Sequence, residues 1–198
     1  VCSSPTGPAF EGAQVSSGQR ATIGAIERVR IDRDTLEPRL KCIGSDLWSD
    51  EPGFSEAMSG TGVTGICGSG IIEVIAEMYL AGIITTDGVV NGALAEHTQR
   101  ITADGRTFSY VLHRADDPET SDVLVTQNDV RQIQLAKAAL YAGIKLLMDE
   151  MGVTTVDRIR LAGAFGSHIS VSHAMVLGLI PDCDLEQVTS AGNAAGAG

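Results

Sequence analysis

The chain has 198 residues, 43% of them apolar, which is enough for one domain with a sizeable core. It has no apolar run of membrane-spanning length, no signal peptide and no lipidation motif, so we expect a cytoplasmic protein. Its net charge of −11 and the lack of a basic stripe disfavour nucleic-acid binding.

The four cysteines, Cys2, Cys42, Cys67 and Cys183, lie far apart and form no C-x-x-C pair. This spacing argues against a zinc site and against an iron–sulfur cluster held within the chain. We expect Cys42 and Cys183 to be ordinary packing residues. Because the chain begins at Val1 and not at Met, it is expected to be a piece of a longer protein.

Residues 1–24 are rich in glycine, serine and proline, which precludes a long regular helix. Two readings stay open for them: a disordered end, or a compact loop with a short helix around Phe10 that packs against a ligand or a partner. Two strands are predicted next, over 26–31 and 39–43, because β-branched residues are separated by charges and turn signals lie between the segments. The simplest arrangement of these strands is an antiparallel pair.

A glycine-rich stretch, 60–70, leads into a predicted helix whose apolar residues recur at helical spacing from Ile71, with Glu73 and Glu77 on the opposite, polar side and Gly82 as the C-terminal cap. Two interpretations of the turn at 68–70 stay open. In the first, the turn brings backbone close to a nucleotide, since glycine has no Cβ and a helix start favours an anion. In the second, glycine only lets the helix pack closely on a neighbour. Cys67 is expected to be a small buried residue.

Residues 83–128 are predicted to be rich in β-structure, with a hairpin turn at Asp104-Gly105 and an alternating strand over 108–112. His97 and His113 stand apart from each other and from any carboxylate at a clear spacing. We therefore expect them on the surface or at a strand edge and not on a metal.

A long helix is predicted over 129–151, capped by Asn128 or Asp129 and ended by Gly152. Its apolar residues trace a wide stripe, and its many alanines allow another helix or a sheet to approach closely. We expect a core helix that also suits dimerisation and has no catalytic role.

A short strand over 157–162 is predicted to run into a glycine turn at 163–167 and then a helix from about Ile169. Such a turn either holds a nucleotide against the main chain or is a tight turn without a ligand. A last strand within 185–190 leads to another turn of small residues, which includes Gly192.

Six phrases of the sequence resemble the carboxy-terminal domain of the reductive activators of corrinoid proteins: CSSPTGPAFEGA, GICGSGIIE, TQNDVRQIQLAKAALYAGIKLL, LAGAFGSHI, GLIPDC and AGNAAG. The similarity covers nearly the whole chain. It implies an α/β fold, an actin-like (RNase H-like) lobe with a mixed sheet flanked by helices, in the superfamily of acetate and sugar kinases, heat-shock cognate proteins and actin. Residues 1–198 would form a single domain, the second lobe of a two-lobed ATPase domain.

The resemblance also implies a function. Members of this family are iron–sulfur ATPases that return an inactive Co(II) corrinoid protein to Co(I) during methyl transfer, and they are expected to dimerise through this domain. The cluster would lie in an amino-terminal region before Val1. The phrases LAGAFG, CGSG and PAFEGA are expected to face the nucleotide. The residues assigned to that site are Gly163, Ala164, Phe165, Gly166, Gly68, Ser69, Gly70, Glu11, Gly192 and Asn193.

The chain departs from the superfamily in having neither of its Asp-Gly phosphate loops, because the Asp-Gly pairs at 87–88 and 104–105 lie in turn contexts. Phosphoryl transfer needs a metal and positioned charge around the γ-phosphate. We therefore expect the adenosine side of an ATP site here, negligible ATPase activity by this chain alone, and Mg²⁺ only in the complete protein. Two alternatives are a dimerisation or docking module whose glycine turns are structural, and a small-molecule kinase, which rests on fold analogy alone.

Overall fold

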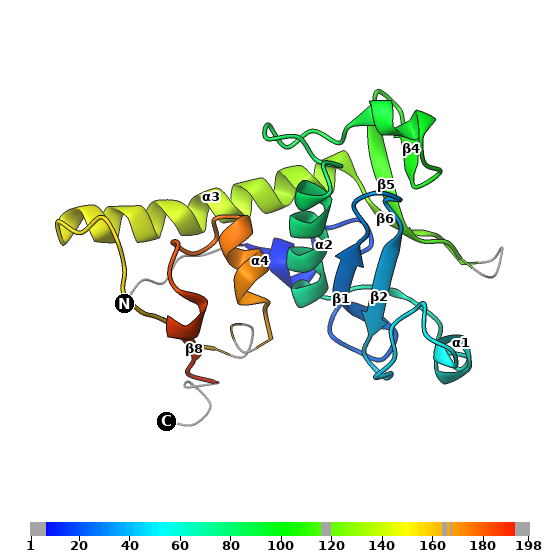
Figure 1. Cartoon of the computed structure of the whole chain (residues 1–198), viewed down its shortest axis with the longest axis horizontal. Helices are drawn as coiled ribbons and strands as arrows, with labels where there is room; N and C mark the ends of the chain where they lie inside the picture. Colours follow the sequence, from blue (N-terminus) through cyan, green and yellow to red (C-terminus); the bar gives the residue numbers. More distant parts are fainter. Residues whose placement is uncertain (1–6, 116–119, 164–165, 167, 193–198) are drawn as a thin grey trace.

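The computed structural model describes residues 7–115, 120–163, 166 and 168–192, and it is a mixed α/β structure. In Figure 1 one long helix, α3, runs along the molecule and two small sheets lie near the end at which it begins. The elements in chain order are η1 (Pro8–Glu11), β1 (Ala25–Ile31), β2 (Pro38–Cys42), α1 (Phe54–Ala57), β3 (Gly65–Ile66), α2 (Gly68–Leu80), η2 (Gly92–Glu96), β4 (Ile101–Asp104), β5 (Thr107–His113), β6 (Val123–Val125), α3 (Gln127–Glu150), β7 (Ile159–Leu161), α4 (Val171–Val176), η4 (Leu185–Gln187) and β8 (Val188–Ser190).

The first sheet has the order β2-β1-β3 and is mixed. β1 and β2 are antiparallel, with Ile31 opposite Pro38, which confirms the predicted pair, and β3 adds a short parallel strand to β1. Helix α2 packs on β1. It begins at Gly68 and not at the predicted Ile71, because the glycines of its first turn allow the helix to lie directly on the strand.

The second sheet is antiparallel, with the order β4-β5-β6. The predicted hairpin is present, but Asp104 pairs with Thr107, so the two turn residues are Gly105 and Arg106 and, of the Asp-Gly pair, only Gly105 has positive φ, +59°. The strand β5 is buried on both faces over 109–112, so the one-sided alternation predicted for it is wrong there. Two contacts join this sheet to the first: the Tyr110 hydroxyl donates to the carbonyl oxygen of Leu36 at 2.9 Å, and Arg100 pairs with Glu37 at 2.7 Å.

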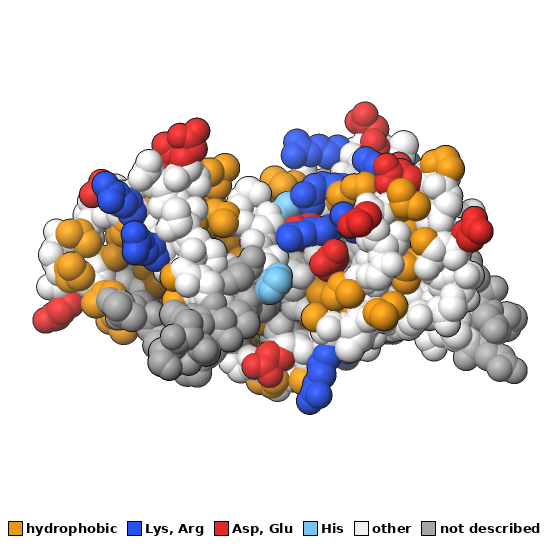
Figure 2. Space-filling model, turned by 90° about the horizontal axis from the view of Figure 1, so that it is seen from below, with side chains coloured by type: hydrophobic (Ala, Val, Ile, Leu, Met, Phe, Trp, Pro, Cys, Tyr) orange, Lys and Arg blue, Asp and Glu red, His pale blue; other side chains and the backbone are white. Residues whose placement is uncertain are grey.

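Helix α3 begins two residues earlier than predicted, with Thr126 and not Asn128 or Asp129 as its N-cap. The Thr126 hydroxyl accepts from the backbone N–H of Asp129, whose carboxylate accepts from the N–H of Thr126 in return. The buried residues of α3, among them Val130 and Ile133, all lie in its first half, although Leu135 there is 60% exposed; in the second half Leu146 is 70% exposed, and Met151 at its C-cap is 66% exposed. Figure 2 shows hydrophobic side chains on the surface at the end of the molecule that the second half of α3 forms. The predicted core helix is therefore confirmed only for the first half.

The amino-terminal segment from residue 7 is a compact loop with a short 3-10 helix, η1, and Phe10 is buried against α2 and α3. At the other end of the chain, β7 and β8 form a two-stranded parallel sheet. Both strands are shorter than predicted, and in the case of β8 this is because η4 occupies 185–187. Among the described residues, the helices lack the combination of length and apolar character that a membrane crossing requires.

Candidate functional site

Two of the predicted glycine turns meet at one edge of the β7/β8 sheet. Because these strands are parallel, the turns that follow them lie side by side. The N–H of Gly163 donates to the carbonyl oxygen of Gly192 at 2.9 Å, and the N–H of Ala191 donates to that of Leu161 at 2.8 Å. The crevice beyond the carboxyl ends of parallel strands is where ligands bind in open α/β sheets.

Both glycines leave open space beside the backbone. Gly163 has φ +106° and Gly192 has φ +68°, conformations that residues with a Cβ rarely adopt. A Cβ built at either position meets no atom of the described residues within 4 Å. At Gly166, by contrast, it would lie 3.2 Å from Cβ of Leu161. A ligand can therefore approach the main chain at Gly163 and Gly192.

Three assigned residues, Ala164, Phe165 and Asn193, lie outside the described part of the chain. Glu11 is exposed at the end of η1. Helix α2 packs against η1 and also against α4, the helix that follows the turn of Gly163. The helix whose first turn carries the predicted residues thus packs against elements that belong to or follow the other two predicted segments.

The first turn of α2, with Gly68, Ser69 and Gly70, has a structural reason for its glycines. A Cβ at Gly70 would lie 2.3 Å from the carbonyl oxygen of Ile26, so this position requires glycine for packing alone. The Ser69 hydroxyl lies 3.3 Å from the sulfur of Cys67, which is buried as expected. Nucleotide contact by this turn stays a prediction.

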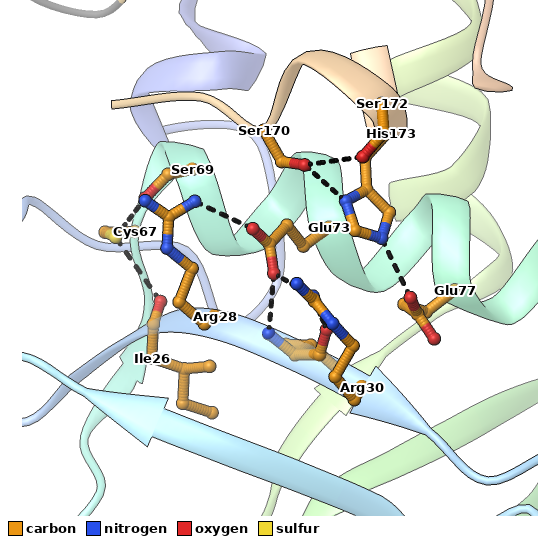
Figure 3. Close-up of polar contacts among 11 residues, drawn as sticks. Ile26, Arg28, Arg30, Cys67, Ser69, Glu73, Glu77, Ser170, Ser172 and His173 are labelled. Atoms are coloured by element: carbon orange, nitrogen blue, oxygen red, sulfur yellow. Dashed lines mark hydrogen bonds and ion pairs between the residues drawn. The ribbon is translucent and has the colours of Figure 1, made fainter. Parts of the chain in front are cut away.

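A polar cluster that the sequence did not reveal connects α2 to α4 (Figure 3). His173 is buried, with Nδ1 2.6 Å from the hydroxyl oxygen of Ser170 and Nε2 2.8 Å from Oε1 of Glu77. An ionised carboxylate only accepts hydrogen bonds, so the Glu77 contact assigns the Nε2 proton, and Nδ1 of a neutral imidazole then accepts from Ser170. The imidazole thereby fixes the start of α4 against α2.

Next to this cluster, the fully buried carboxylate of Glu73 binds the edge of β1 (Figure 3). It accepts hydrogen bonds from Arg28 at 2.8 Å, from Arg30 at 2.6 Å and from the backbone N–H of Val29 at 3.0 Å. One turn later, Glu77 accepts from the N–H of Ile31 at 3.0 Å. Two carboxylates thus satisfy backbone donors of β1 beyond its short pairing with β3.

The sequence placed Glu73 on the polar side of a helix, and the burial of its side chain is a correction. Its two arginine partners lie in a strand 43 and 45 residues earlier, so no local spacing indicates the contact. His173 likewise has no neighbouring signal, because Glu77 is 96 residues away. By contrast, His97 is exposed and His113 is half-buried at the end of β5, both as expected.

The cysteines differ in their surroundings. Cys42 is fully buried, as predicted, and burial, with a smaller contribution from the Glu27 carboxylate, raises the pKa of its thiol to about 12. Cys183 is only half-buried, and its thiol donates to the carbonyl oxygen of Asp157 at 3.5 Å. Within the described ranges, no group of three or more His, Cys, Asp and Glu residues is arranged to hold a metal ion.

Comparison with known proteins identifies relatives over the whole chain. The model of the family described as the C-terminal domain of RACo, the ASKHA domain, matches residues 1–198. The corrinoid activation enzyme RamQ of Eubacterium limosum is 34% identical over 206 residues, which cover 100% of this chain and 32% of that protein.

A solved structure described as a reductive activator for corrinoid,iron-sulfur protein aligns with a TM-score of 0.78 and 31% identity, covering 97% of this chain and 28% of the other. The chain therefore spans less than a third of the length of either relative. The matched fold agrees with the actin-like α/β lobe expected from the sequence. The chain belongs to the family of RACo C-terminal ASKHA domains.

Proposed function

We propose that this chain supplies the adenosine side of the nucleotide site in an ATP-dependent activator that returns a Co(II) corrinoid protein to Co(I). The family supports the class of protein, since both relatives are named for corrinoid activation. The observation that carries the assignment to residues is the pair Gly163 and Gly192, which lie side by side with open space at both Cβ positions.

The geometry suits the base and sugar of a nucleotide better than its phosphates. Open glycine backbone admits a flat group at close range. The described residues offer no group of acidic side chains at this edge arranged for a metal ion, and the sequence lacks the Asp-Gly phosphate loops. In this proposal another part of the protein binds the phosphates and Mg²⁺, which neutralises charge during phosphoryl transfer, and holds the iron–sulfur cluster.

A substitution at Gly163 tests the nucleotide assignment. In the complete protein, Gly163→Asp places a carboxylate in the open space and adds strain at φ +106°. We expect Mg-ATP affinity, measured by isothermal titration, to fall by at least about 10-fold, together with corrinoid activation. Gly105→Asp is the matched control, because Gly105 also has positive φ and an open Cβ position but lies in the β4–β5 turn.

Unchanged ATP affinity in a folded Gly163→Asp protein would overturn the adenosine assignment. The 198-residue chain by itself is expected to bind Mg-ATP weakly and to lack ATPase activity. Micromolar affinity of the isolated chain would show that the phosphate contacts are also here.

A second candidate function is a dimerisation or docking module, in a cytoplasmic protein that acts on a corrinoid partner. The second half of α3 favours it, since Tyr141, Leu146 and Met151 are each more than half exposed. Leu146→Glu tests this function by sedimentation of the complete protein. A dimer that dissociates in this variant while ATP binding persists supports a separate docking role, and an unchanged dimer refutes it for this helix.

A further inference from the structure

Two adjoining hollows lie on the surface between α2, α3 and α4. The first has a volume of about 170 Å³ and a floor of apolar side chains that includes Ile75, Ile133 and Leu177. The second, of about 430 Å³, lies along α3 beside Gly178. Gln134 and Lys137 line both hollows, so the two form one continuous depression. None of its lining residues belongs to the β7/β8 edge or to the assigned nucleotide residues.

Lys137 differs from the other two lysines of the chain. Lys41 pairs with Asp46 at 3.7 Å, and Lys145 pairs with Asp149 one turn along α3. For Lys137, no carboxylate of the described residues lies within ion-pair distance. A chain with a net charge of −11 thus presents an ammonium group without a described carboxylate partner where the two hollows meet.

The walls around this ammonium group are held in place. The Gln134 amide oxygen accepts from Arg131 at 2.9 Å, and its nitrogen contacts the carbonyl oxygen of Asp87 at 3.4 Å. Gly88 packs so closely on Gln134 that a Cβ there would overlap its side chain. On the other side, a Cβ at Gly178 would lie 3.3 Å from Cε of Lys137, so the lysine stem rests along this backbone. The depression is therefore a preformed surface.

We propose that this depression binds a small organic anion with an aromatic or branched apolar body. The body would cover the apolar floor and the exposed ring of Tyr79, which is 41% exposed, while the anionic group meets the ammonium of Lys137. Burial of the body gives non-directional affinity, and the charge-assisted contact selects an anion. A single cation disfavours a polyanion such as a nucleoside triphosphate, which separates this site from the proposed nucleotide site.

A matched pair of probes tests the charge selection. Naphthalene-1-sulfonate and 1-naphthylmethylammonium share a ring system and carry opposite charge. We expect the sulfonate to bind the chain at least about 10-fold more tightly in NMR titration, with shifts at α3 and at 84–88. Equal binding of the two probes, or shifts confined to other surfaces, would overturn the proposal.

Substitution of the lysine completes the test. Lys137→Met keeps the stem and removes the charge, so the preference for the sulfonate should disappear, whereas Lys145→Met on the same helix should preserve it. If Lys137→Met perturbs folding, Lys137→Gln provides the same comparison in a polar side chain. A preference that persists in a folded Lys137 variant refutes the site, and displacement of the sulfonate by Mg-ATP would assign the depression to the nucleotide instead.

Discussion

His173 lies with Nε2 2.8 Å from Oε1 of Glu77, although 96 residues separate the two in the chain. The contact joins α4, which follows the Gly163 turn, to α2, which packs on β1. The Glu77 carboxylate is shared, because its other oxygen accepts from the N–H of Ile31. The position of the β7/β8 edge, where we propose the nucleotide site, relative to the first sheet therefore depends on a few buried polar groups.

Removal of the imidazole should destabilise this connection. His173→Ala leaves a largely buried Glu77 oxygen without its partner and reduces the contacts of the Ser170 hydroxyl to that with Ser172, so we expect a loss of roughly 2 kcal/mol in the free energy of unfolding. Urea denaturation followed by circular dichroism measures it. His97→Ala is the control, since His97 is exposed, and it should change stability by less than about 0.5 kcal/mol. Equal stability of the two variants would contradict the role of the cluster.

Neutralising Glu73 should have an effect of similar size. Glu73→Gln removes the charge that compensates Arg28 and Arg30 and replaces one of the two acceptor oxygens with an NH2 donor, so the three donors of the site can no longer all be satisfied. Breaking a buried ion pair by removal of one partner costs about 3 kcal/mol, and the partial exposure of both arginines reduces this amount. We expect about 2 kcal/mol in urea unfolding. Glu56→Gln, at an exposed position of α1, should leave the free energy of unfolding unchanged. Unchanged stability of Glu73→Gln would show that solvent replaces the carboxylate.

Gly70→Ala should destabilise the protein, although alanine has the higher helix propensity. Alanine favours a helix over glycine by about 1 kcal/mol, yet at this position its Cβ would lie 2.3 Å from the carbonyl oxygen of Ile26. We expect Gly70→Ala to lower the melting temperature by several degrees, because α2 must move away from β1. Gly60→Ala is the control, since a Cβ there meets no atom within 4 Å. A Gly70→Ala protein as stable as the wild type would show that α2 shifts without loss of packing.

The same glycine shows what the sequence can and cannot predict. Features set by local chemistry were predictable: the hairpin, although its turn lies one residue later than expected, at 105–106, the antiparallel pair β1/β2, and the end of α3 at Gly152, which has φ +66°. The start of α2 was not, because contact with a strand outweighs the unfavourable helix propensity of the glycines at 68 and 70. Helix propensity depends on the residue itself, whereas the contact between α2 and β1 joins residues far apart in the chain.

The candidate site likewise has parts that the sequence predicted and parts that it did not. The turns at Gly163 and Gly192 were each predicted from small residues after a short strand. Their contact follows from the parallel pairing of β7 and β8, which the sequence did not specify. The burial of Glu73 depends on arginines of another element, so it was misassigned to a polar helix face. Side chains whose partners are distant in the chain were therefore the least predictable part.

The Cys42 thiol provides a prediction for alkaline pH. Burial raises its pKa from an ordinary value of 9.0 to about 12, so above pH 9 the unfolded chain loses this proton while the folded chain keeps it. The folded state then binds more protons, and the free energy of unfolding falls as pH rises, by up to about 1.4 kcal/mol per pH unit until the folded pKa is reached. Well below pH 9 this contribution is constant.

Urea unfolding at about pH 8 and about pH 10 measures the decline, and the free energy of unfolding of Cys42→Ala should fall by about 1.4 kcal/mol less than that of the wild type over this interval. Tyr110, whose pKa is also raised by burial, contributes equally to both proteins and cancels in the difference. Identical slopes would mean that the thiol ionises as readily in the folded chain as in the unfolded one.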